Sequence, residues 1–270
     1  AQRLDLPIEI ITPPGHIYVR YNDGENIINI ETTARGINPP SEMYLGINTR
    51  KLELRNMKEV IGMAFFNQAS VYWQRMEHET TVKLYEKALP YMKDDKLLEM
   101  FLGLNYLFLG RKIEGEKLLK PLKDYTFDYA VSPDTLATDY LNGHVSAEGI
   151  QTVFMPVDET RESIIKKQDE LKKLLKRYPK FRGGILQLAI SYLQLARAGE
   201  ALKILTQYHE IDPNDPTVEY YLSIVCAERY DFNKSWEYLQ SAEKITAARD
   251  HHPAALRGLR NKLRTVCPES

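Results

Sequence analysis

A pattern of residues that recurs every 34 positions constrains the fold of this chain more than any other feature. One pair of units places large and small residues in phase: Leu188, Ala189, Tyr192, Ala201, Leu205 and Tyr208 are followed 34 positions later by Leu222, Ser223, Cys226, Ser235, Leu239 and Ala242. A second in-phase pair occupies the first half, where Ala69, Tyr72, Thr81, Tyr85 and Ala88 precede Gly103, Tyr106, Gly115, Leu119 and Leu122. A period of this length, with small residues where two helices would cross, predicts stacked helical hairpins.

These units resemble the tetratricopeptide repeat. The Trp that is usual early in that repeat is missing, but Pro213 lies where the second helix of the family commonly ends. The resemblance implies a mainly α fold of helical hairpins that binds protein or peptide partners on a concave surface lined by the first helices. The residues expected to line that groove are mostly apolar: Phe66, Trp73, Met100, Leu104, Leu107, Leu186, Ile190 and Leu193. An apolar groove is expected to be covered by the chain itself or by a hydrophobic partner, and it disfavours a carboxylate clamp.

The composition sets limits on the class of protein. Lys and Arg number 36 against 37 Asp and Glu in the 270 residues, so the overall charge gives no reason to expect nucleic-acid binding. A run of apolar residues long enough to span a membrane is missing, and so is a signal-peptide pattern, which predicts a cytoplasmic chain. Neither a nucleotide-binding loop nor a metal-ligand spacing occurs, so no cofactor and no metal are expected. The oligomeric state cannot be read from these residues.

Five segments follow from the breaks in the pattern. Residues 1–54 read as a small antiparallel β segment with a connector, 55–129 as a first repeat block, 130–158 as a degenerate repeat or insert, 159–249 as a long helix with a second repeat pair, and 250–270 as a capping helix with a tail. The long helix is rich in lysine, and its lysines are expected to face solvent while Ile164, Leu171, Leu174 and Leu175 face inward.

The β segment contains the strongest local signal for a hairpin. Asp23-Gly24 separates two alternating stretches, as a two-residue turn requires. If Asn22 and Glu25 flank the turn, then Tyr18 faces Asn29 and His16 faces Glu31, and the aliphatic face is the buried one. A carboxylate beside an imidazole fixes the tautomer of the imidazole, as the acid does in a nucleophile–His–acid triad.

The residues around this pair carry a second resemblance. Pro14-Gly15-His16-Ile17-Tyr18-Val19-Arg20, followed by Asn29-Ile30-Glu31-Thr32-Thr33, is similar to the His strand and acid strand of bacterial transglutaminase-like proteins, which belong to the papain-like cysteine hydrolases. The resemblance implies that His16 matches the catalytic His and Glu31 the acid, which is usually Asp. The family's Cys precedes the His strand, and the few residues before His16 contain none.

Two functions from different classes remain open. The first is a protein-interaction scaffold whose repeats are fused to an incomplete, inactive transglutaminase-like domain. The alternative is a C-terminal fragment of an active thiol acyltransferase, amidase or protease whose Cys lies upstream of residue 1. The plainer interpretation of His16 and Glu31 is an ordinary cross-strand pair on a solvated hairpin, where ion pairs contribute little. Cys226 falls at a repeat-core position and Cys267 in the tail, so neither is expected to replace the nucleophile.

Overall fold

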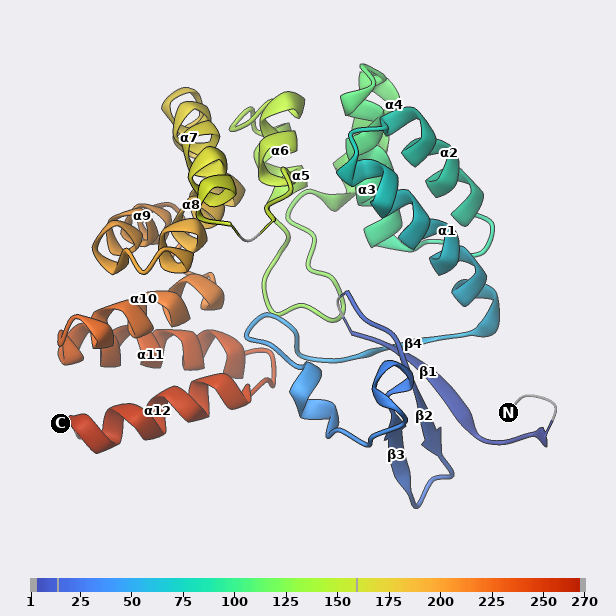
Figure 1. Ribbon diagram of the computed structural model, residues 1–270, viewed down its shortest axis with the longest axis horizontal. Helices are drawn as coiled ribbons and strands as arrows, with labels where there is room; N and C mark the ends of the chain where they lie inside the picture. The colour runs from blue at the N-terminus through green and yellow to red at the C-terminus, as the bar shows by residue number, and fades with distance from the viewer. Residues whose placement is uncertain (1–3, 14, 159, 268–270) are drawn as a thin grey trace.

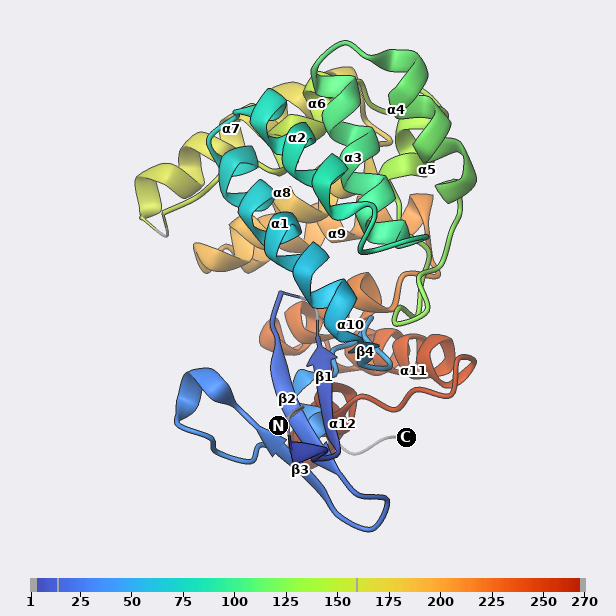
Figure 2. The ribbon, with the colours of Figure 1, turned by 90° about the vertical axis from the view of Figure 1, so that its right-hand side faces the viewer.

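The computed structural model describes residues 4–13, 15–158 and 160–267; Pro14 of the His-strand segment and Glu159 before the long helix lie outside the described residues. Helical hairpins follow one another along an arc, and a small sheet lies across the gap between the first and last helices (Figures 1 and 2). The mainly α architecture of tetratricopeptide-like repeats with an N-terminal antiparallel β segment is therefore confirmed.

Four hairpins correspond to the four units of the 34-residue pattern. They are α1 (Met57–Gln74) with α2 (His78–Ala88), α3 (Lys96–Phe108) with α4 (Lys112–Leu119), α8 (Arg182–Gln194) with α9 (Ala198–Ile211), and α10 (Pro216–Glu228) with α11 (Phe232–Ala247). The small positions allow the helices to approach closely, because a Cβ on Gly115 would lie 2.8 Å from the carbonyl oxygen of Gly103. The pattern thus records where the backbones of two helices cross.

Short polar motifs set where several helices begin. The Asn56 side chain accepts from the backbone N–H of Glu59, and the Glu59 carboxylate accepts from the backbone N–H of Asn56, which together form a capping box for α1. Asp215 accepts from two N–H groups of the first turn of α10, where Pro216 occupies a position that needs no N–H donor. Pro213, which lies where the second helix of the repeat family commonly ends, follows the end of α9 at Ile211.

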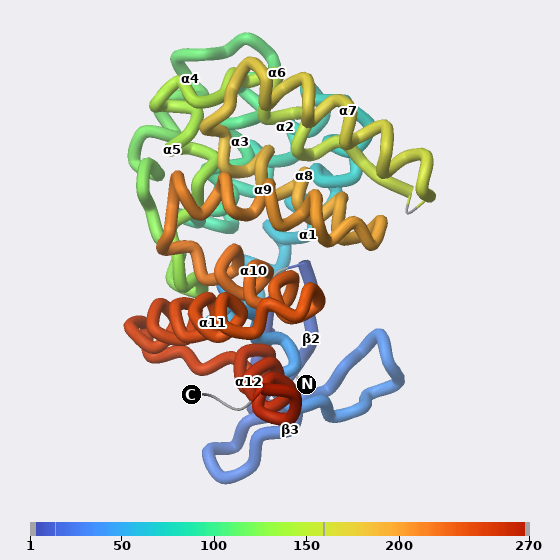
Figure 3. Tube along the Cα trace, turned by 90° about the vertical axis from the view of Figure 1, so that its left-hand side faces the viewer, coloured from blue at the N-terminus to red at the C-terminus, as the bar shows by residue number. Residues whose placement is uncertain are grey.

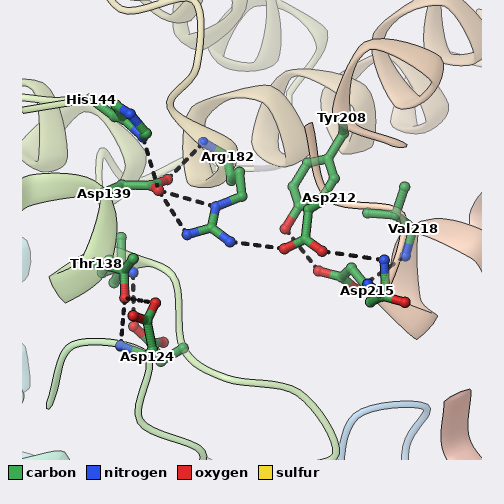
Figure 4. A network of polar contacts seen from close by, with 12 residues as sticks. Asp124, Thr138, Asp139, His144, Arg182, Tyr208, Asp212, Asp215 and Val218 are labelled. Carbon is green, nitrogen blue, oxygen red and sulfur yellow. Dashed lines mark hydrogen bonds and ion pairs between the residues drawn. The ribbon is translucent and has the colours of Figure 1, made fainter. Parts of the chain in front are cut away.

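The middle of the chain joins the two pairs of repeats. It contains η4 (Lys120–Leu122), α5 (Leu136–Leu141), α6 (Ala147–Val153) and α7 (Arg161–Arg177), and the seven-residue α6 packs against α3, α7 and α8. Figure 4 shows a polar link between the same halves, in which Asp139 of α5 binds Arg182 at the start of α8. Stacking of helices therefore continues across the interruption in the sequence pattern.

The last helix, α12 (Ala254–Val266), closes the array, with Leu256 and Leu263 buried against α10 and α11. Figure 3 follows α7 to α12 in chain order down one side of the molecule. Leu259 on the same helix is half-buried.

The sheet has four antiparallel strands in the order β3-β2-β1-β4. Their bounds are β1 (Ile8–Thr12), β2 (Tyr18–Asn22), β3 (Ile27–Ile30) and β4 (Glu53–Arg55). The predicted hairpin is formed by β2 and β3, and β1 and β4 pair beside it. Two short helical turns, η2 (Thr32–Ala34) and η3 (Ser41–Tyr44), follow β3.

The predicted register of the hairpin was wrong by two residues. Arg20 pairs with Asn29, and Asn22 pairs with Ile27, so the loop contains four residues instead of two. The Asp23 carboxylate accepts hydrogen bonds from the backbone N–H groups of Glu25 and Asn26 and so stabilises the longer loop. A shift of two positions leaves every side chain on the same face of the sheet, because side chains alternate along a strand.

The assignment of the buried face was also wrong. Tyr18, Asn29 and Glu31 are buried, whereas Ile28 on the aliphatic face is 43% exposed. The polar face is covered by the chain that follows β3, and the Asn29 amide donates to the carbonyl of Pro39 and to the Ser41 hydroxyl at 2.7 and 3.0 Å. Burial of these polar groups is tolerated because their hydrogen bonds are satisfied.

Residues 46–50 connect the sheet to both halves of the array. The carbonyl of Gly46 lies 2.8 Å from Nε2 of His251, beyond α11. Ile47 is buried with Trp236 and Leu263 in the C-terminal core. Asn48 accepts from the backbone N–H groups of Val131 and Ser132 at 3.0 and 2.7 Å. This short segment, near the centre of Figure 1, therefore bridges the C-terminal end of the array and the loop between η4 and α5.

Candidate functional site

The His16–Glu31 pair predicted from the hairpin forms in the structure. Nε2 of His16 lies 2.5 Å from Oε2 of Glu31, although the corrected register places Glu31 diagonally across from His16. The Glu31 side chain also accepts from the hydroxyls of Thr33 and Tyr44 at 2.6 and 2.8 Å. Hydrogen bonds from Thr33, His16 and Tyr44 lower the pKa of the Glu31 carboxyl to about 2, so it is ionised at neutral pH.

Aromatic rings fix the position of the imidazole. The Tyr44 ring stacks on His16 with centroids 5.7 Å apart and on Tyr18 with centroids 4.7 Å apart. Burial raises the pKa of the Tyr44 phenol to about 12, and the hydrogen bond to Glu31 adds to this effect. Tyr44 was not among the predicted site residues, because its contact with His16 depends on how the connector folds back over the sheet.

The pair has the chemistry of an oriented general base, but the two described cysteines belong to other parts of the fold. Glu31 holds one ring nitrogen of His16, as the acid of a triad does, and the His16 side chain is 32% exposed. Cys226 is buried in α10, and burial raises the pKa of its thiol, which disfavours the reactive thiolate. The carbonyl of Cys267 accepts from Nε1 of Trp236 at the other end of the array.

The groove residues predicted in the first two repeats lie inside the protein. Trp73, Met100, Leu104 and Leu107 are buried, and Phe66 is half-buried beside Tyr85 and Phe101. Phe154, which follows α6, packs against the Trp73 indole at a tilt, with ring centroids 4.6 Å apart. The inner surface of these two repeats is therefore filled by the chain's own middle segment, the outcome expected for an apolar groove that is closed to water.

The three groove residues of the next repeat have different surroundings. Leu186 and Leu193 are half-buried and pack against the core formed by α8, α9 and α10. Ile190 instead lines a cavity of about 230 Å³ between α7 and α8, together with Val157, Ile164, Lys167, Gln187, Ser191 and Gln194. The structure thus does not bring the eight predicted residues together on one open surface.

Lys167 contradicts the expectation that the lysines of α7 face solvent. Only 9% of the residue is exposed, and its ammonium donates to the carbonyl of Val153 at 2.9 Å. Burial lowers the pKa of the Lys167 ammonium. Lys167 lies three residues after Ile164 and four before Leu171, so helical periodicity places it on the apolar face, and this spacing could have identified it.

An open apolar groove, which the sequence analysis missed, lies at the C-terminal end. It has a volume of about 610 Å³ between α10 and α12, and its apolar walls include Tyr220, Ile224, Phe232, Leu259, Leu263 and Val266. Tyr230 at its edge is 83% exposed. Tyr220 and Ile224 belong to the first helix of the last repeat, so this groove occupies the position that the resemblance implies for partner binding.

No three His, Cys, Asp or Glu side chains within 4–13, 15–158 and 160–267 are grouped so that they could hold a metal ion. In the same part of the chain, no helix combines the length and the apolar character that crossing a membrane requires.

Two solved proteins resemble this chain in structure, with low TM-scores. No family model and no curated protein matches the chain. A structure of the MamA protein is 10% identical, with a TM-score of 0.35 over 72% of this chain and 94% of that chain. YrrB, described as a tetratricopeptide-repeat protein with an unusual peptide-binding site, is 16% identical, with a TM-score of 0.35 over 72% of this chain and 89% of that chain. The assignment of the repeats therefore rests on the paired helices of this chain and not on these likenesses.

Proposed function

We propose that this protein is an interaction scaffold that binds a protein or peptide segment in the groove between α10 and α12. The observation that carries the proposal is the open apolar groove itself, with Tyr230 exposed at its edge. Contiguous apolar surface rimmed by polar residues is typical of protein-binding sites, and exposed tyrosines are enriched among residues that dominate binding energy. The inner surface of the first two repeats, by contrast, is already occupied by Phe154.

The charge of α12 defines the partner more closely. Its sequence carries four basic residues and no acidic one, and Lys262 lies on the groove wall. Among the described residues that line the groove, Glu228 is the acidic one. A segment with apolar side chains flanked by acidic residues would complement this surface, because its flanks would meet the positive potential of α12.

Synthetic labelled peptides test this proposal. Two helix-forming peptides share leucines at positions i, i+4 and i+7 and differ only in acidic or basic flanks, and fluorescence anisotropy measures their binding to the full chain. We expect the acidic-flanked peptide to bind at least about tenfold more tightly. Gly258→Phe should abolish that binding by filling the groove, since an added Cβ meets no atom within 4 Å and the variant should fold.

Asn261→Phe provides the matched control. Asn261 is exposed on the same helix and does not line the groove, so this variant should bind the acidic-flanked peptide as the wild type does. Equal loss in both variants would refute the groove as the site, and equal binding of the two peptides would refute the preference for acidic flanks.

A second function is favoured by one observation, the short His16–Glu31 contact beneath Tyr44. In this alternative the chain belongs to a transglutaminase-like thiol acyltransferase, amidase or protease. A Cys thiolate from a segment preceding residue 1 would attack an acyl carbonyl, His16 would transfer the thiol proton to the departing amine, and Glu31 would hold the imidazole. Water would then hydrolyse the thioester and release the acid and the thiol.

The alternative is decided on a protein translated from the full reading frame. A cysteine-directed alkyne probe should label an upstream Cys, and His16→Asn should reduce that labelling, whereas Glu25→Gln in the exposed hairpin loop should not. An upstream segment without Cys, or labelling that His16→Asn leaves unchanged, would exclude this chemistry. Peptide binding in the α10–α12 groove is measured separately and does not depend on the result.

A further inference from the structure

A buried lysine faces a cavity that lies apart from the C-terminal groove. Lys167 of α7 is one of the seven described residues that line the cavity between α7 and α8, and among these it is the one charged residue. An ammonium group has three N–H donors. The carbonyl of Val153, at 2.9 Å, accepts one of them.

The bond to Val153 explains why the lysine is inside but not why a cavity lies beside it. Val153 is the last residue of α6, and a cation near the final carbonyls of a helix is favourable. A neutral carbonyl does not compensate a buried charge as a carboxylate would. Burial is accordingly the one cause that lowers the pKa of Lys167, and none of the described acidic side chains acts against it. The cavity walls that the structure describes therefore lack a negative group.

The remaining walls determine what kind of anion fits. Gln187 and Gln194 contribute amide groups, and Gln194 is exposed, so the cavity reaches the surface. The Ser191 hydroxyl donates to the carbonyl of Leu188 at 2.7 Å, which leaves its oxygen as an acceptor. Val157, Ile164 and Ile190 form the apolar part of the wall.

The volume limits the size of the ligand. The cavity of about 230 Å³ corresponds to about eight water molecules at ~30 Å³ each. A carboxylate with a short branched aliphatic group has this size and offers both an anion for the ammonium and a methyl-rich end for the apolar wall. A phosphate or sulfate would gain the ion pair but would leave Val157, Ile164 and Ile190 against a strongly hydrated group.

We propose that the Lys167 cavity binds a carboxylate that carries a short branched aliphatic group, with Lys167 as the cationic partner and Val157, Ile164 and Ile190 around the aliphatic part. Two sources share this chemistry: a free small aliphatic acid, and the C-terminal residue of a peptide that ends in valine or leucine.

Calorimetric titration of the full chain tests the proposal with four probes. Isovalerate is compared with the neutral isovaleramide, and acetyl-Gly-Ser-Val with a free carboxylate is compared with its C-terminal amide. We expect each acid to bind at least about tenfold more tightly than its neutral counterpart. Tighter binding of isovalerate than of the peptide acid assigns the site to a free acid, and the reverse order assigns it to a peptide end.

Three variants distinguish loss of binding at this cavity from a general effect of substitution on the protein. Lys167→Met should weaken binding of the acid at least about tenfold, whereas Lys166→Met, at the neighbouring lysine outside the cavity wall, should leave it unchanged. Because Lys167→Met also removes the bond to Val153, Ile190→Phe fills the cavity while keeping that bond, and it should abolish binding on a folded chain. Equal affinity of acid and amide, no heat from either acid, or binding that survives Ile190→Phe would overturn the proposal.

Discussion

The indole of Trp73 and the ring of Phe154 lie with their centroids 4.6 Å apart, which joins the first helix of the array to the residue that follows α6. Phe101 of α3 also meets both rings edge to face, at 5.2 and 6.3 Å. Aromatic clusters of this kind contribute beyond the area that they bury. The segment that interrupts the repeat pattern is thus a structural part of the first two repeats.

Phe154→Ala should therefore destabilise the whole chain and not only the loop that contains it. Phe154 is half-buried, so we expect the free energy of unfolding to fall by roughly 2 kcal/mol, below the ~3–5 kcal/mol typical of a fully buried Phe. Urea denaturation followed by circular dichroism measures the change. Ile113→Ala, at a side chain that is 86% exposed, should change stability by less than ~0.5 kcal/mol.

Leu104→Ala distinguishes a core residue from a residue that lines an open groove. Leu104 is fully buried in α3, so its truncation should lower the unfolding free energy by about 2–5 kcal/mol. Trp73→Ala should have a comparable effect. Melting temperatures that stay at the wild-type value, together with lost binding of a partner, would instead reveal an open binding surface at these positions.

The helical fold was predictable because its signal is local and repeated. Small residues such as Gly103 and Gly115 must recur wherever two helices cross closely, so their spacing reports the geometry directly. The sheet was less predictable. Asp23-Gly24 predicted a turn, but the Asp23 carboxylate binds two backbone N–H groups and closes a longer loop. The alternation of Ile28 and Asn29 marked two faces, but it could not tell which one the connector would cover.

The same limit applies to the candidate sites. His16 and Glu31 were found from sequence because neighbouring strands place them close together under either register. The contact of Tyr44 with His16 and the burial of Lys167 depend on segments folding over one another. The C-terminal groove arises between α10 and α12, and no residue pattern within either helix indicates the space between them.

Glu31 should give the chain a pH-dependent component of stability. Its pKa falls from an ordinary 4.5 to about 2 in the folded state. The ionised carboxylate therefore stabilises the folded chain above about pH 4.5, and this contribution is lost as the pH falls toward 2. Glu31→Gln should be less stable than the wild type at pH 7, and the difference should shrink as the solution is acidified.

Urea midpoints at several pH values between about 7 and about 2.5 measure that difference. Glu25→Gln, at an exposed carboxylate in the hairpin loop, is the control and should differ from the wild type by a small and constant amount. A stability difference for Glu31→Gln that stays constant across this range would contradict a lowered pKa of Glu31.

Arg182 should be the most sensitive single position in the polar link between the two halves. Its guanidinium donates to Oδ1 of Asp139 from Nε and Nη2 at 3.0 and 2.8 Å and to Oδ2 of Asp212 from Nη1 at 2.8 Å (Figure 4). Asp139 is fully buried, and Arg182→Met removes the guanidinium that pairs with its carboxylate. We therefore expect a loss of about 3–5 kcal/mol in unfolding free energy.

Two further variants show whether charge or geometry matters in this link. Arg182→Lys keeps the charge but cannot form the planar fork, so its unfolding free energy should lie between those of the wild type and Arg182→Met. Asp139→Leu in the Arg182→Met background removes the stranded carboxylate and should recover part of the lost stability. If the double variant is instead less stable than Arg182→Met by the full effect of Asp139→Leu alone, the two residues are not coupled, and the halves are held together by the packing of α6 between α3 and α8.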